Sequence, residues 1–149
     1  MTDTKLCYTF IMESTVGTLY TFDQIDPRIR RVTRGLINAV IERVIQSLAP
    51  QRIILFGSCA RGSAKHDSDI DLLVQIDDHH PLARQKRRDR SGRVLKLFPY
   101  RSFGLDTIVL TENELQALLA ANEGEWDLML EILAEGKVMY ERPEKAPPE

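Results

Sequence analysis

Apolar residues recur at every third or fourth position between residues 27 and 48. The repeating positions are Ile29, Val32, Leu36, Val40, Val44 and Leu48. This spacing places them on one face of an α-helix, and Asp26 with Pro27 suits the cap and first position of that helix. We therefore predict an amphipathic helix over 27–48, with its apolar face against a core.

Three short runs rich in Ile, Leu and Val follow, and each is typical of a β-strand. They cover residues 52–57, 69–76 and 102–110. Their β-branched content and the turn-forming residues around them favour strands over helices. A last run of this kind, at 137–140, predicts an edge strand.

Helices are predicted between and after these strands. A short helix starts near Cys59, and a basic helix covers roughly 82–98 before Pro99 interrupts it. Thr111 and Glu114 have the spacing of a capping box, which predicts a helix start. A further helix contains Trp126, Met129, Leu130 and Leu133 and ends at Gly136. The order of elements predicts an α/β fold, a small mixed twisted sheet flanked by helices.

The composition favours a single domain. A chain of 149 residues that is 43% hydrophobic and 28% charged suffices for one core and hardly for two. We assign the domain to residues 25–141. Residues 1–24 are interpreted as an N-terminal extension with a β-hairpin, and the Pro-rich, charged residues 142–149 as a disordered tail.

The connection between the first two strands carries candidate chemistry. Gly57 and Ser58 follow the first strand, and Asp69 and Asp71 open the second. Glycine lets a phosphate approach the main chain, and serine adds a hydroxyl. Two acids spaced by one residue project from the same face of a strand and offer the oxygen ligands that Mg²⁺ prefers. Together these residues predict a phosphate and metal site held by the sheet.

A third carboxylate would complete such a site. Two-metal sites clamp both the attacking and the leaving oxygen, and this takes more than one pair of ligands. Asp106 is the single acid in the strand predicted at 102–110. Because that strand should neighbour the other two, Asp106 is our candidate. The alternative is that Asp106 is a surface residue on an edge strand.

The motif resembles the signature of the DNA polymerase β-type nucleotidyltransferases, most closely of their minimal branch. It reads Gly57-Ser58-x-Ala60-Arg61-Gly62-x5-Ser68-Asp69-x-Asp71-Leu72. The resemblance implies transfer of AMP from ATP to a hydroxyl. It further implies that the Gly-Ser turn holds the triphosphate, that both motif aspartates bind two Mg²⁺ ions, and that Asp106 completes the metal set.

The same resemblance implies a biological role. Many minimal nucleotidyltransferases are antitoxins, and their partner is a HEPN-domain ribonuclease toxin encoded nearby. The expected function is transfer of AMP to a hydroxyl of that toxin, a tyrosine, within a hetero-oligomer. Two alternatives stay open: an antitoxin that acts by binding alone, and a small-molecule nucleotidyltransferase. The second usually needs another domain, for which the roughly 40 residues after the Asp106 strand leave little room.

Other polar residues of the motif region have two interpretations each. Arg61 either grips a phosphate or pins the turn through a buried ion pair. Ser68 either contacts the nucleotide or caps the turn before the strand. We include both as candidate nucleotide-binding residues. His66, His79 and His80 are interpreted as loop and turn residues rather than catalytic or metal-binding ones.

Charge is segregated along the chain, although its net value is only −2. Residues 84–101 carry eight basic and one acidic side chain, whereas residues 102–149 carry three and eleven. The basic run suits a phosphate, RNA or an acidic protein surface, or it is a solvated helix face. Few aromatic residues lie within it, which argues against direct nucleic-acid binding.

The sequence also predicts a cytoplasmic protein that does not enter membranes. No apolar stretch approaches the roughly 20 residues of a membrane span, and the start of the chain lacks a signal-peptide layout. Cys7 and Cys59 do not form a Cys-x-x-Cys motif. We therefore expect both to be reduced thiols.

Overall fold

The computed structural model describes residues 30–65, 67–121 and 126–143. Ten elements follow one another in this part of the chain. They are α2 (Arg34–Leu48), β1 (Arg52–Phe56), α3 (Ser58–Arg61), β2 (Ile70–Ile76), the 3-10 helix η1 (Pro81–Arg84), α4 (Arg87–Leu95), β3 (Leu105–Thr111), α5 (Glu112–Ala120), α6 (Trp126–Glu135) and β4 (Lys137–Glu141).

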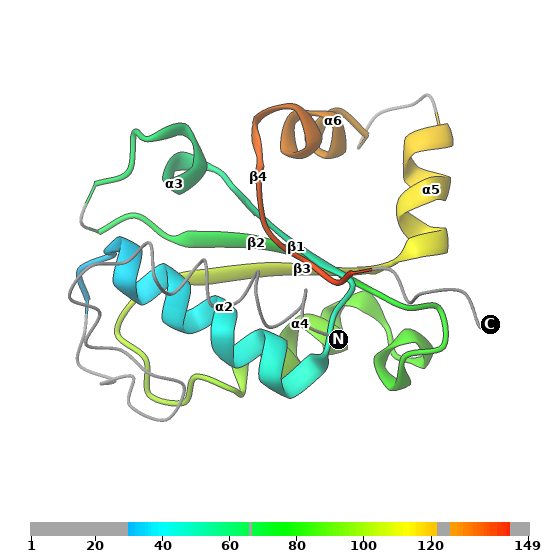
Figure 1. Ribbon diagram of the computed structural model, residues 1–149, viewed down its shortest axis with the longest axis horizontal. Coiled ribbons are helices and arrows are strands. Elements are labelled where there is room, and N and C mark those ends of the chain that lie inside the picture. Colours follow the sequence, from blue (N-terminus) through cyan, green and yellow to red (C-terminus); the bar gives the residue numbers. More distant parts are fainter. Residues whose placement is uncertain (1–29, 66, 122–125, 144–149) are drawn as a thin grey trace.

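The four strands form one mixed sheet in the order β3-β2-β1-β4 (Figure 1). β1 runs antiparallel to both β2 and β4, and β2 runs parallel to β3. The parallel pair requires a crossover, which η1 and α4 supply. The predicted α/β fold with a small mixed sheet is confirmed, and the predicted last strand lies at one edge.

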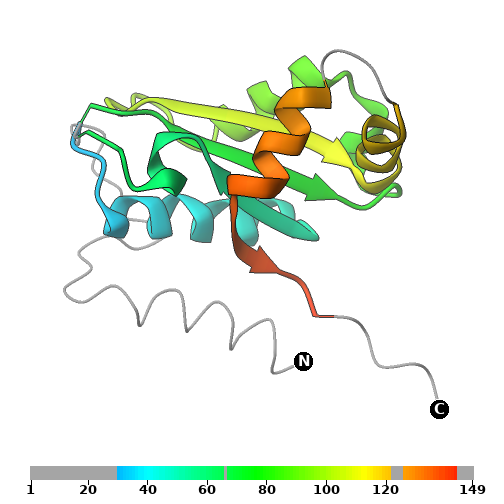
Figure 2. The same cartoon turned by 90° about the horizontal axis from the view of Figure 1, so that it is seen from above.

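Helices cover both faces of this sheet, α2 and α4 on one and α5 and α6 on the other (Figures 1 and 2). Alternation along each strand divides the core accordingly, because neighbouring residues point to opposite faces. In β1, Ile53 belongs to the cluster with α2, whereas Ile54 belongs to the cluster with α5 and α6. Buried Leu36 and Val40 confirm the predicted apolar face of α2.

The helix predicted over 27–48 starts later than the sequence predicts. α2 begins at Arg34, and the hydroxyl of Thr33 accepts the Leu36 N–H at 3.1 Å. A threonine cap satisfies a backbone donor that would otherwise lack a helical partner. The predicted cap, Asp26 with Pro27, lies outside the described residues.

The predicted basic helix over 82–98 is divided in two, which corrects the sequence prediction. Gln85 is extended between η1 and α4, with φ −89° and ψ 159°. The cause is Arg90, which is only 4% exposed and donates to the carbonyls of Leu82 and Ala83 at 2.9 Å. Those carbonyls therefore bind a guanidinium instead of continuing a helix.

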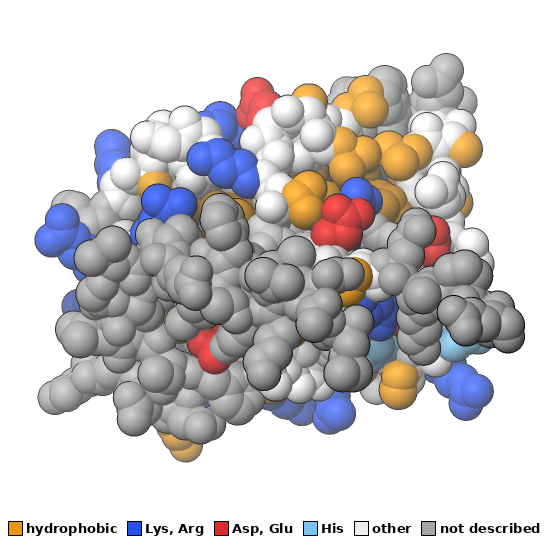
Figure 3. Space-filling view, viewed as in Figure 1, with side chains coloured by type: hydrophobic (Ala, Val, Ile, Leu, Met, Phe, Trp, Pro, Cys, Tyr) orange, Lys and Arg blue, Asp and Glu red, His pale blue; other side chains and the backbone are white. Residues whose placement is uncertain are grey.

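The helices on the other face agree with the sequence prediction. Thr111 and Glu114 form both halves of the capping box, each hydrogen bond measuring 3.1 Å. The helix around Met129 ends at Glu135, directly before Gly136 as predicted. On the face seen in Figure 3, hydrophobic side chains gather over α5 and α6.

Several predictions fall on the ends of the chain. The N-terminal hairpin within residues 1–24 and the tail from residue 144 onward lie outside the described residues. Arg142 is described, and its guanidinium binds Asp77 at 2.6 Å. Among the described helices, none is both long and apolar enough to span a bilayer.

Candidate active site

One end of the sheet carries three carboxylates on the face that α5 and α6 cover. Asp71 in β2 is the register partner of Asp106 in β3, and Asp69 lies one residue before β2. Residues two apart on a strand share a face, so Asp69 and Asp71 project on the side of Leu73, which packs with α5 and α6. Ile70 and Leu72 point to the opposite face and are fully buried in the cluster there.

The three acids are close enough for their charges to interact. The pKa of Asp71 is raised to about 6, chiefly by burial and also by the charges of Asp106 and Asp69, whereas the charge of Arg61 opposes this rise. Asp69 and Asp106 are exposed and Asp71 is half-buried. Repulsion among neighbouring carboxylates favours any cation that binds between them.

The donor chemistry of this cluster fits Mg²⁺. Carboxylate oxygens are hard ligands, and Mg²⁺ commonly takes one or two of them together with phosphate oxygens and water. Within the described residues, no three His, Cys, Asp or Glu side chains already form a metal site. The acids therefore supply suitable ligands without being gathered around one point.

Gly57 places the motif turn directly against Asp71. Its φ of 73° and ψ of −157° belong to a region that residues with a side chain rarely adopt. A Cβ built on Gly57 would overlap the Asp71 carboxylate, with Cγ only 3.1 Å away. Ser58 follows as the first residue of α3. The predicted phosphate turn and the predicted metal ligands are thus neighbours.

Arg61 is paired with two acids of α6. Its guanidinium lies 3.6 Å from a carboxylate oxygen of Glu131 and of Glu135. All three side chains are roughly half exposed, so this is a surface ion pair and not the buried one that was one interpretation of Arg61. A cavity of about 180 Å³ lies beside these three residues, lined also by Phe56, Gly57 and Ile132.

Ser68 and His80 have contacts that hold turns and helices in place. The Ser68 hydroxyl accepts the Lys65 N–H at 2.8 Å, which is the turn-capping interaction. His80 lies 2.7 Å from the Leu48 carbonyl and accepts the Leu82 N–H at 3.0 Å, so it connects α2 to η1. His66 lies outside the described residues.

Two residues near the acids were not identified from the sequence. Gly104 lies against the Asp69 carboxylate, and the Cys59 thiol donates to the Asp69 carbonyl at 3.3 Å. Burial raises the pKa of Cys59, and so do the charges of Asp71 and Asp69. The sequence contains one indication that Gly104 lies level with Asp69 across the two strands. Gly104 precedes Asp106 by two residues, just as Asp69 precedes Asp71.

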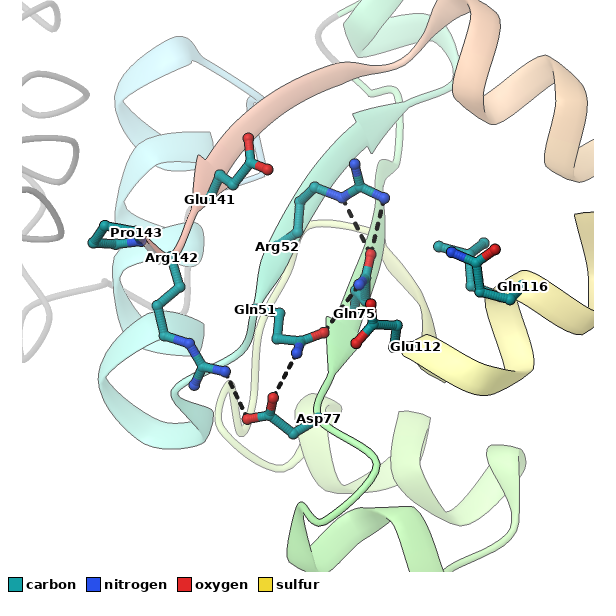
Figure 4. Close-up of a pocket in the computed structure, with 10 residues that line it drawn as sticks. Gln51, Arg52, Gln75, Asp77, Glu112, Gln116, Glu141, Arg142 and Pro143 are labelled. Atoms are coloured by element: carbon teal, nitrogen blue, oxygen red, sulfur yellow. Dashed lines mark hydrogen bonds and ion pairs between the residues drawn. The ribbon is translucent and has the colours of Figure 1, made fainter. Parts of the chain in front are cut away.

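A larger cavity, of about 630 Å³, lies at the opposite end of the sheet (Figure 4). It is not at the carboxylates, and its side chains are largely hydrogen-bonded to one another. Arg52 donates to Gln75, which donates to Gln51, and Asp77 accepts from both Gln51 and Arg142. We therefore place the candidate active site at the acids and not in this cavity.

Comparison with known proteins identifies the family of the chain. A family model described as a nucleotidyltransferase domain matches residues 37–140. No curated protein matches the chain.

Two of the solved structures that resemble the chain illustrate the level of similarity. A putative nucleotidyltransferase from Sulfolobus solfataricus has 23% identity and a TM-score of 0.45, covering 69% of this chain and 75% of that chain. A toxin-antitoxin with AMP-PNP has 20% identity and a TM-score of 0.44, covering 69% and 72%. Likenesses this distant add nothing about the function of this chain.

Proposed function

Because the chain belongs to the family of nucleotidyltransferase domains, we propose that it transfers AMP from ATP to a protein hydroxyl with Mg²⁺. The observation that carries the proposal is the grouping of Asp69, Asp71 and Asp106 on one face of the sheet, beside the Gly57 turn. Their charges affect one another, and a nucleotide with divalent cations would relieve that repulsion.

In the proposed reaction the acceptor oxygen attacks the α-phosphorus, the bond to the bridging oxygen breaks, and pyrophosphate leaves. A bound Mg²⁺ would supply the positive charge that neutralises the triphosphate and lowers the pKa of the acceptor hydroxyl, whose proton would pass to solvent water. Asp69 and Asp71 would hold two ions, and Asp106 would help to hold one. Gly57 and Ser58 would position the β- and γ-phosphates so that attacking and leaving oxygens lie in line.

Arg61 and Ser68 have supporting roles in this proposal. Arg61 lies near enough to lower the pKa of Asp71, so its charge also acts on anions bound beside that residue. Ser68 holds the turn that leads into β2 through its bond to Lys65. Arg61 is therefore proposed to bind the nucleotide through its charge, and Ser68 to contribute to nucleotide binding by fixing this turn.

We further propose a HEPN-domain ribonuclease toxin as the acceptor, modified on a tyrosine, with this chain as its antitoxin. The support is the motif resemblance, and a protein acceptor would bring its own hydroxyl to the carboxylates.

Intact-mass measurement of the neighbouring gene product, after incubation with this protein, ATP and Mg²⁺, tests the proposal. We expect the mass to rise by whole AMP units. Asp71→Asn should slow this at least about 100-fold, because it removes one charge from the reacting centre. Asp89→Asn, at an exposed position of α4, is the matched control and should keep the parent rate.

Two outcomes would contradict the proposal. No mass gain on the partner, with nucleotide and metal verified as bound, would favour an antitoxin that acts by binding alone. Neutralisation of the toxin by Asp71→Asn without attached AMP would show that occlusion suffices.

A further inference from the structure

Gly104 occupies the strand position beside Asp69. It precedes β3, and its carbonyl accepts the Ile70 N–H at 2.9 Å, so the backbone of this residue is fixed to the start of β2. The next residues in register are the partners Ile70 and Leu105, followed by Asp71 and Asp106. Asp69 and Gly104 therefore continue the row of cross-strand pairs that contains the other two acids.

The space beside Gly104 is filled by a carboxylate. A Cβ built on Gly104 would lie 2.6 Å from Cγ of Asp69 and 3.3 Å from its Cβ. Atoms without a bond between them do not approach so closely, so any side chain at residue 104 would displace the Asp69 carboxylate. Asp69 is exposed, and its carboxylate can move into solvent at little cost.

Backbone conformation does not explain this glycine. Within the described residues, the glycines with positive φ are Gly57 and Gly62. Gly104 has no such requirement, so alanine fits its backbone. What glycine contributes here is the absence of a side chain.

We propose that Gly104 is a positioning residue for the nucleotidyl-transfer site, a step that rests on the proposed function. Because Gly104 has no side chain, the Asp69 carboxylate occupies the space beside it. In that position the carboxylate stays close to Asp71 and Asp106. Gly57 leaves a corresponding place for Asp71. Asp71 thus lies against Gly57, which follows β1, and Asp69 lies against Gly104, which precedes β3.

Gly104→Ala tests this, with Gly92→Ala as the matched control. A Cβ at Gly92 meets nothing within 4 Å, so that variant adds the same methyl group in open space. Mn²⁺ binding is measured by titration in the presence of a non-hydrolysable ATP analogue, and the melting temperature is measured without metal. We expect Gly104→Ala to bind Mn²⁺ about 10- to 100-fold more weakly. Its melting temperature should stay at the parent value, and Gly92→Ala should leave Mn²⁺ affinity unchanged.

A second comparison asks whether Gly104 acts through Asp69. In an Asp69→Ala background the displaced carboxylate is already missing, so adding Gly104→Ala should not weaken Mn²⁺ binding further. Full additivity of the two effects would overturn the proposal. So would parent-like Mn²⁺ affinity of Gly104→Ala, or a large fall in its metal-free melting temperature, which would make Gly104 a structural residue only.

These results are distinguishable from failure of the proposed function. If the parent protein binds no Mn²⁺ with nucleotide, the proposed function fails, and the role of Gly104 fails with it. If the parent binds Mn²⁺ and Gly104→Ala does so equally well, only the role of Gly104 is overturned.

Discussion

A side chain at Gly57 would face an unfavourable backbone conformation and would also overlap a carboxylate, whereas a side chain at Gly62 would face only the first of these. Both have positive φ, 73° and 74°, but only at Gly57 would a side chain meet a carboxylate. A Cβ at Gly62 has nothing within 4 Å. Comparing variants of Gly57 and Gly62 therefore distinguishes the effect of backbone strain from the effect of displacing Asp71.

We predict that Gly57→Ala destabilises the fold by about 1–3 kcal/mol through backbone strain. It should also slow nucleotidyl transfer roughly 100-fold, because Asp71 must move. Gly62→Ala is the control, with a strain cost of about 1–2 kcal/mol and transfer close to the parent rate. Urea denaturation and the transfer assay measure the two effects. Equal transfer rates in both variants would contradict the displacement of Asp71.

At the scale of elements, Arg90 and Glu114 connect the two sides of the sheet. Arg90 in α4 binds carbonyls of η1 and β3 and the Glu114 carboxylate, at 2.6 Å. Glu114 at the same time caps α5 through Thr111. One ion pair thus holds the crossover helix, a strand and the start of the next helix together.

This ion pair predicts a loss of stability in acid. Burial alone would raise the pKa of Glu114, but hydrogen bonds from Arg90, Arg87 and Thr111 outweigh it and lower the pKa to about 2. A lowered folded pKa means that the contribution is complete above the ordinary value of 4.5 and is lost as the pH falls toward 2. Urea unfolding between pH 6 and pH 2 measures it.

Glu114→Gln should flatten that pH dependence and lower the free energy of unfolding at pH 7. Glu112→Gln, at the exposed first position of α5, is the control and should follow the parent curve. A Glu114→Gln curve parallel to the parent across this range would show that Glu114 is not the titrating group.

The contacts of Arg90 explain why the structure of the basic segment was predicted only in part. The sequence shows the surplus of positive charge over 84–101, but it leaves open whether this segment binds an anionic partner or is a solvated helix face. Burial of Arg90 depends on the carbonyls of Leu82 and Val109, which only the folded chain brings to it. Local spacing predicts helix, and it contains no information on a partner 19 residues away.

For the whole molecule, one face of the sheet has three zones. The carboxylates lie at one end, an apolar zone under α5 and α6 follows, and Arg52 with Gln75 lies at the other end. Glu131 and Glu135 add negative charge beside Gly57, where the proposal places the triphosphate. They pair with Arg61, so they compete with a nucleotide for its charge.

We predict that Glu131→Gln with Glu135→Gln tightens ATP binding about two- to fourfold at low salt, since two nearby repulsive charges disappear. The gain should shrink at high salt. Stability should hardly change, because exposed ion pairs contribute little. Glu112→Gln with Glu141→Gln makes the same charge change at the opposite end of the sheet and is the control. Calorimetric titration with ATP measures both, and equal gains in the two double variants would exclude a local effect at Arg61.

The sequence by itself determined the strands, the capping box and the chemical type of the candidate site. Those features depend on residues close together in the chain, such as Asp69 and Asp71 or Thr111 and Glu114, so local spacing is enough to predict them. Only the tertiary structure decided that Asp106 is the register partner of Asp71, that Arg61 pairs with α6, and that Gly104 leaves space for Asp69. The physical reason is that register and side-chain overlap arise between strands far apart in sequence, where packing of the whole core sets the alignment.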